Sequence, residues 1–154
     1  MPGMLIQMRV RGLMLDPPNN YVVILRGEEG QDVLPIWIGK AEANSISLAL
    51  EQVEMPRPLT HDLIKNALDA LEAKVNSVVI TDLKDNTYYA KLHLSHHDAE
   101  ITIDTRPSDA IAIALRTECP VFVSRDVLRR QMEDEDIARW LENLRPEDFG
   151  KADA

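Results

Sequence analysis

The sequence is poor in several features that particular protein classes need. Only one of its 154 residues, Cys119, is a cysteine, which excludes an intrachain disulfide and a zinc site built from several cysteines. No apolar run approaches the roughly 20 residues that a membrane-spanning helix requires. The N-terminal residues 1–12 lack the basic region, long apolar stretch and cleavage site of a secretion signal. We therefore expect a cytoplasmic protein with no membrane partner.

Positive charge is also scarce. There are 17 Lys and Arg residues against 26 Asp and Glu residues, which gives a net charge of -9. Proteins that bind nucleic acid through many phosphate contacts usually have a basic surface. The segment 126–154 has nine acidic and five basic residues, so four of the nine net negative charges belong to it. The composition argues against a broad nucleic-acid-binding surface, but it is compatible with a small basic or metal-loaded site.

Several well-known catalytic motifs are missing. The sequence has no Walker-type loop, no GxGxxG, no GxSxG and no CxxC. Nucleotide-dependent motors, Rossmann-type redox enzymes and serine hydrolases are therefore disfavoured.

What is present suits a folded domain, because 45% of the residues are hydrophobic. Alternating and β-rich runs predict strands over 4–15, 21–26 and 33–38, and short turns between them favour an antiparallel meander. Further strands are predicted over 75–83, 88–94, 99–105 and 120–124.

Helical periodicity appears in three places before the C-terminal region. It predicts helices over 41–53, 60–71 and 109–118. The second has a continuous apolar stripe, formed by Leu63, Ile64, Ala67, Leu68 and Leu71. The third is apolar almost all round, which indicates that it is deeply buried.

A short helix is expected after residue 124, followed by a C-terminal amphipathic helix. The second of these has an apolar stripe formed by Ile137, Trp140, Leu141 and Leu144, and it would pack on the domain or on another subunit. The predicted fold is a single α+β domain over 1–130, with mixed or antiparallel β-sheets packed with three main helices. Residues 131–154 form its helical tail.

Two of the predicted helices begin with related sequences. The run Arg57-Pro58-Leu59-Thr60-His61-Asp62 resembles Arg106-Pro107-Ser108-Asp109. In a purely structural interpretation, Thr60 and Ser108 cap their helices and the acids complement the helix dipoles. A guanidinium gains nothing from the positive end of a dipole, so each arginine should have a partner, either an internal carboxylate or an anionic ligand.

The same residues allow a functional interpretation. Free amides at a helix N-terminus, beside an arginine and a histidine, can bind phosphate. Carboxylates near strand ends and helix starts could bind Mg²⁺ or Mn²⁺, which would activate water for phosphodiester hydrolysis. The carboxylates in such places are Glu42, Asp62, Asp104 and Asp109.

Three runs in this order resemble the bifunctional nuclease family, whose small domains are described as having both DNase and RNase activity. They are Leu34–Asn44, Arg57–Leu63 and Asp104–Arg116. The resemblance covers about residues 4–130. It implies a single α+β domain that self-associates, with DNA and RNA as substrates that the acidic chain would bind weakly.

Chemistry at these motifs gives the candidate site residues. We predict His61 as a general acid or base, with Asp62 and Asp109 as the catalytic carboxylates. Arg57 and Arg106 would bind phosphate. Glu42, Asp62 and Asp109 would bind the divalent metal, Mg²⁺ or Mn²⁺. The alternative is a non-catalytic oligomeric module that is regulatory or binds a small anion.

Overall fold

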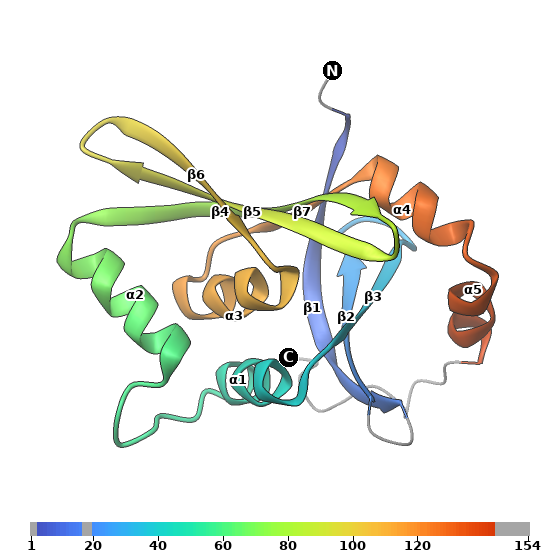
Figure 1. Cartoon of the computed structure of the whole chain (residues 1–154), viewed down its shortest axis with the longest axis horizontal. Helices are drawn as coiled ribbons and strands as arrows, with labels where there is room; N and C mark the ends of the chain where they lie inside the picture. Colours follow the sequence, from blue (N-terminus) through green and yellow to red (C-terminus); the bar gives the residue numbers. More distant parts are fainter. Residues whose placement is uncertain (1–2, 17–19, 144–154) are drawn as a thin grey trace.

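A computed structural model describes residues 3–16 and 20–143, and its strands form one seven-stranded mixed sheet in the order β3-β2-β1-β7-β4-β5-β6 (Figure 1). The strands are β1 (Leu5–Asp16), β2 (Asn20–Gly27), β3 (Val33–Ile38), β4 (Ala73–Lys84), β5 (Thr87–His96), β6 (Ala99–Thr105) and β7 (Val121–Ser124). The helices are α1 (Lys40–Leu50), α2 (Thr60–Ala70), α3 (Pro107–Thr117), α4 (Arg125–Met132) and α5 (Glu135–Glu142). The predicted α+β class is confirmed.

Strand β7 joins two antiparallel meanders into this one sheet. The first meander is β1–β3 and the second is β4–β6. Strand β7 pairs antiparallel with β1 and parallel with β4. The β4–β5 and β5–β6 connections are two-residue turns, Asp85-Asn86 and His97-Asp98, with positive φ at all four residues. Turns with this backbone match the twist of the strands they join.

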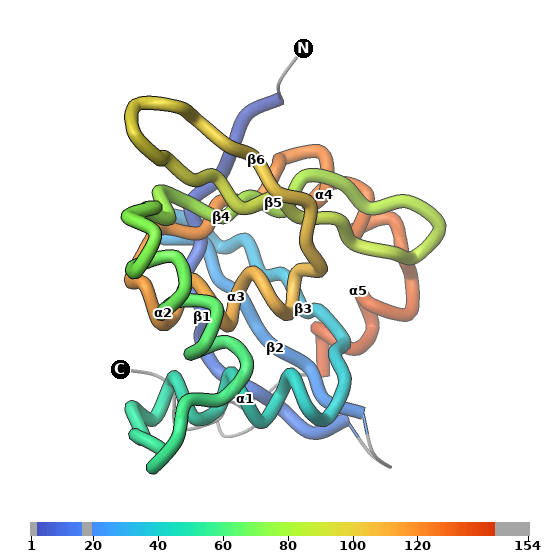
Figure 2. Tube along the Cα trace, turned by 60° about the vertical axis from the view of Figure 1, so that its left-hand side comes forward, coloured from blue at the N-terminus to red at the C-terminus, as the bar shows by residue number. Residues whose placement is uncertain are grey.

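Helix α3 lies at the centre of the hydrophobic core. Residues 110–114 are at most 3% exposed, and they belong to the same apolar cluster as Val78, Ile80 and Leu92 of the sheet. The expected deep burial of this helix is therefore confirmed. Helices α1 and α2 both pack against α3 on this side of the sheet, as the two views in Figures 1 and 2 show. Three helix N-termini are thus brought into one region of the molecule.

The two helices that follow β7 pack back against the sheet. Helix α4 packs on β4 and β7, and the Trp140 ring of α5 meets the Trp37 ring of β3 with centroids 5.2 Å apart. Leu144, the last residue of the predicted stripe, is outside the described residues. In the described part of the chain, no helix has the length and apolar character to span a membrane.

The predicted helix caps are wrong in both cases. Thr60 is the first residue of α2, not its cap, which is Leu59. In α3, Arg106 is the cap, Pro107 is the first residue, and Ser108 is buried one position further on. Proline has no N–H to satisfy and its φ already suits a helix, so α3 begins without a side-chain cap.

The predicted apolar stripe on α2 is present, but much of it is exposed. The exposed fractions of Leu63 and Leu71 are 61% and 66%. The loop before the helix adds Val53 and Met55, which are also exposed. Helix α2 therefore presents an apolar face that the described residues leave exposed.

We expect Leu63→Glu to separate the oligomer, if the predicted self-association uses this face. The substitution should change the free energy of unfolding by less than about 0.5 kcal/mol, because Leu63 is exposed and Glu is a good helix former. Light scattering on a sizing column measures the mass, and Gln31→Glu is the matched control with the same charge change in an exposed turn. An oligomer that survives Leu63→Glu would place the contact elsewhere.

Candidate functional site

His61 links the three helices. It lies in the first turn of α2 and is only 7% exposed. Its Nδ1 is 2.6 Å from the Oγ of Ser45 in α1, and its Nε2 is 2.9 Å from an Oδ of Asp109 in α3. One imidazole thus bridges a buried hydroxyl and a carboxylate from the two neighbouring helices.

The carboxylate of Asp109 determines which ring nitrogen of His61 carries the hydrogen. Burial by itself raises the pKa of Asp109, but hydrogen bonds from Arg106 and His61 and their charges outweigh burial, so the pKa lies below its usual value. The ionised carboxylate can only accept, so Nε2 of His61 donates to it. In the neutral ring, Nδ1 then accepts the hydrogen of the Ser45 hydroxyl.

The network reaches the surface at Arg106. Its Nε donates to the second oxygen of Asp109 over 2.9 Å, and one Nη lies 3.9 Å from Glu42. The hydrogen bond to Asp109 raises the pKa of Arg106 further, so the guanidinium stays charged. The Arg106 side chain is 64% exposed, against 27% for Asp109, 19% for Glu42 and 9% for His61. A ligand would therefore meet Arg106 first.

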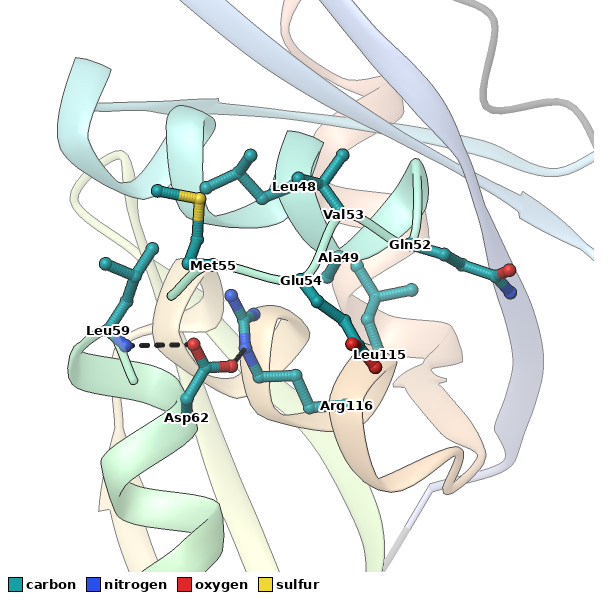
Figure 3. Close-up of a pocket in the computed structure, with 10 residues that line it drawn as sticks. All are labelled: Leu48, Ala49, Gln52, Val53, Glu54, Met55, Leu59, Asp62, Leu115 and Arg116. Carbon is teal, nitrogen blue, oxygen red and sulfur yellow. Dashed lines mark hydrogen bonds and ion pairs between the residues drawn. The ribbon is translucent and has the colours of Figure 1, made fainter. Parts of the chain in front are cut away.

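Asp62 points to a different partner, Arg116 of α3. The Nε of Arg116 donates to Asp62 over 2.7 Å, and the other Asp62 oxygen accepts the N–H of Leu59 (Figure 3). The Leu59 bond and then the Arg116 bond hold the pKa of Asp62 below its usual value. Arg116 is nearly buried, and it also donates to the carbonyl oxygens of Ser45 and Ala112. This second link therefore fastens the same three helices together.

The Asp62–Arg116 pair lines a pocket of about 210 Å³. Figure 3 shows that its other walls come from the end of α1 and from the loop that leads to α2. The lining is mixed, because Leu48, Val53 and Met55 are apolar whereas Gln52 and Glu54 are polar.

The three predicted metal-binding acids occupy equivalent positions. Glu42, Asp62 and Asp109 are each the third residue of their helix. The first two accept the backbone N–H of the residue before the helix, Gly39 and Leu59, and so satisfy an amide that the helix leaves free. Asp109 instead accepts only from the side chains of His61 and Arg106. Among the three, Asp109 is the one whose carboxylate is free of a capping bond.

The structure brings His61, Asp109, Arg106 and Glu42 together. It leaves Asp62 in the separate pair with Arg116, and Arg57 is exposed without a hydrogen bond or ion pair to any described residue. Sequence reasoning missed Ser45 and Arg116. The available signal for Ser45 was its place next to the apolar Ile46 in α1. The available signal for Arg116 was its place two helical turns after Asp109 in α3.

The arrangement does not suit a divalent cation. Within residues 3–16 and 20–143, no three His, Cys, Asp or Glu side chains are close enough to hold a metal ion. Asp62 faces Arg116, while Glu42 and Asp109 both face Arg106. A metal at Glu42 and Asp109 would have to take the place of the Arg106 guanidinium.

Residues 23–136 match the family described as the bifunctional nuclease domain. The match includes every residue of the His61–Asp109 and Asp62–Arg116 links. The chain belongs to the bifunctional nuclease domain family. The predicted resemblance is thereby confirmed.

Individual relatives agree with this assignment. An uncharacterized protein of Mycobacterium tuberculosis is 38% identical over 162 aligned positions, which cover 93% of this chain and 97% of the relative. Bifunctional nuclease 1 of Oryza sativa subsp. japonica is 31% identical over 73% of this chain but only 35% of its own length. Bifunctional nuclease 2 of Arabidopsis thaliana is 30% identical over 67% of this chain and 32% of its own length. The chain therefore spans about a third of these two plant relatives and nearly the whole mycobacterial one.

We expect Arg116→Met to lower the free energy of unfolding by about 2–4 kcal/mol, because it leaves Asp62 and two carbonyl groups without their partner. Urea titration measures the loss. The control is Arg129→Met, which breaks an exposed ion pair with Asp126 and should cost less than about 1 kcal/mol. Equal losses in the two variants would contradict a structural role for the Arg116 link.

Stability should fall in acid because of the two lowered carboxyl pKa values. Asp62 and Asp109 both titrate below the ordinary value of 3.8 when folded. Each therefore contributes stability that is fully present above that value and is lost as the pH falls through the folded pKa. We expect the free energy of unfolding to decline below about pH 4, and Asp62→Asn to reduce this slope. Asp69→Asn, at an exposed acid of the same helix, is the matched control for the change of charge.

Proposed function

We propose that this chain hydrolyses phosphodiester bonds in DNA and RNA at the exposed end of the His61 network. The observation that supports this is the pair formed by Arg106 and Asp109, in which an exposed guanidinium lies against a carboxylate at a motif of a nuclease family. A guanidinium offers paired donors that match a phosphate group. The plant relatives that are named bifunctional nucleases support the same substrate class.

Phosphate binding would change the chemistry of Asp109. When Arg106 turns from the carboxylate to a phosphate, Asp109 loses its largest stabilising hydrogen bond. Its pKa then rises, so it becomes a better base for removing a proton from water. The water oxygen attacks phosphorus, its proton goes to Asp109, and the leaving oxygen takes a proton from solvent. His61 acts as a positioning residue in this scheme, since its ring is almost inaccessible and fixes Asp109 from behind.

A water nucleophile accounts for activity on both nucleic acids. A reaction that used the ribose 2′-hydroxyl would be restricted to RNA. Exposed Arg57 offers a second phosphate contact. With a net charge of -9, the chain would bind its substrate weakly. Because only one or two arginines would contact phosphates, the affinity would depend only modestly on salt.

Divalent-metal assistance stays a prediction, as do self-association and a cytoplasmic location. A divalent metal would be held by Glu42 and Asp109, after the Arg106 guanidinium has moved away from both carboxylates. The exposed apolar face of α2 supports self-association, and the single thiol of Cys119 suits a reducing compartment.

The second candidate is a regulatory module that binds a small anion at Arg106 without cleavage. It is favoured by the engagement of both ring nitrogens of His61 and by its burial, which are typical of a structural histidine. In this case Arg106 would exchange its carboxylate partners for the anion.

We expect Arg106→Gln and Asp109→Asn each to lower the cleavage rate at least about 100-fold, as the loss of a transition-state contact does. Radiolabelled single- and double-stranded DNA and RNA provide the assay, with and without a chelator. Arg106→Gln should melt close to the wild type because its side chain is exposed, and Arg129→Gln serves as an exposed-arginine control with normal cleavage.

Absence of cleavage by the wild type at stoichiometric concentration, together with phosphate binding that Arg106→Gln abolishes, would establish the regulatory module instead. Loss of cleavage on chelation would establish the metal requirement. If Asp109→Asn is unfolded as well as inactive, its loss of cleavage would be explained by a structural role of Asp109.

A further inference from the structure

A second pocket, of about 410 Å³, lies between the sheet and α5. Three aromatic side chains line it, Trp37 of β3, Tyr88 of β5 and Trp140 of α5. It shares no residue with the Arg106 site or with the Asp62–Arg116 pocket.

The two tryptophan rings form an angled wall. Their planes meet at 60° and their centroids are 5.2 Å apart. A nucleobase sandwiched between two rings needs about two stacking distances, roughly 7 Å. The pair is therefore too close to sandwich a base, but its concave corner suits a rounded group that contacts both ring faces.

The charged side chains in the wall are all acidic: Asp16, Asp134 and Asp136. Asp16 accepts the indole N–H of Trp37 over 3.1 Å, and Asp134 accepts two backbone N–H groups at the start of α5. Asp136 is paired with Arg139, whereas Asp16 and Asp134 have no guanidinium partner among residues 3–16 and 20–143, so these two supply the negative charge. Nearby Arg130 donates instead to the Leu83 carbonyl and pairs with Asp126.

Tyr88 adds a polar group without a partner. Its hydroxyl is buried and makes no hydrogen bond among the described residues. Burial, and then the charge of Asp134, raise the pKa of Tyr88 to about 12, so the hydroxyl is neutral. A buried hydroxyl with no partner is costly, and a polar or charged ligand group would relieve that cost.

We propose that this pocket binds a small organic cation whose positive nitrogen bears alkyl groups, such as a quaternary ammonium. The ring faces attract the positive charge, and the two carboxylates add Coulomb attraction in a partly dry site. The alkyl groups contact the apolar parts of the wall, including Leu83 and Ile137. An anionic ligand would meet three carboxylates and no cation among the described lining residues.

Intrinsic fluorescence gives a direct test, because both tryptophans of the chain line this pocket. Choline chloride is titrated into the full chain while tryptophan emission is followed, with sodium chloride matching the ionic strength. The comparison probes are the uncharged isostere of choline, in which a tert-butyl group replaces the trimethylammonium group, and guanosine. We expect choline to give a saturable change, and the isostere to bind at least about tenfold more weakly.

Asp134→Asn provides the matched variant. Asparagine caps a helix as well as aspartate does, so α5 is kept while one charge is removed. Choline affinity should fall about tenfold, whereas Asp69→Asn, the same change on remote α2, should leave it unaltered. Thermal melting confirms that both variants are folded.

Three results would overturn the proposal. One is an isostere that binds as well as choline, which would make the pocket merely apolar. Another is a saturable response to guanosine and none to choline, which would make it a base pocket. The third is unchanged choline affinity in a folded Asp134→Asn. None of these outcomes depends on cleavage of nucleic acid.

Discussion

The arrangement of helices α1, α2 and α3 depends on the two hydrogen bonds that the His61 imidazole makes. The ring hydrogen-bonds to a hydroxyl of α1 on one side and to a carboxylate of α3 on the other, although α2 itself buries little of its apolar stripe. Arg116 adds a second polar link between the same helices. Helix α2 is thus positioned by polar bonds in its first turn, while Leu68 further along packs against the core. Polar links of this kind require specific geometry, because each buried partner would be left unsatisfied if the helices shifted.

This arrangement makes the structural and chemical interpretations of the motif compatible. The buried half, Ser45 and His61, fixes the position of Asp109. The exposed half, Asp109 and Arg106, faces solvent, and the Arg106 bond and then the His61 bond lower the pKa of Asp109. A carboxylate oriented from behind by a histidine and paired in front with an exposed guanidinium is fixed in position before any ligand arrives. Such a site needs no extended basic surface, so the proposed phosphate contact is compatible with an acidic overall charge.

The sequence predicted the fold class, the order of most elements and three of the residues near His61, namely Glu42, Arg106 and Asp109, because apolar periodicity and helix-start motifs are local signals. It did not predict the caps, since proline at the start of α3 and the Asp62 carboxylate in α2 replace the hydroxyl caps that Ser108 and Thr60 suggested. Nor could it show that Asp62 and Asp109 point to different partners, or that Ser45 and Arg116 complete the network. These contacts depend on how helices α1, α2 and α3 pack against one another, and residue spacing and composition carry no information on that packing.

The central position of β7 has a consequence for how the chain reaches this structure. Residues 121–124 pair with β1 on one side and with β4 on the other, so neither meander has its inner edge covered until these residues have been made. During synthesis from the N-terminus, β1 and β4 present unpaired backbone edges that could join to other chains. Insertion of β7 carries α3 with it, since only three residues separate them. Assembly of the sheet and burial of the central helix therefore become one late event, governed by contacts far apart in the sequence.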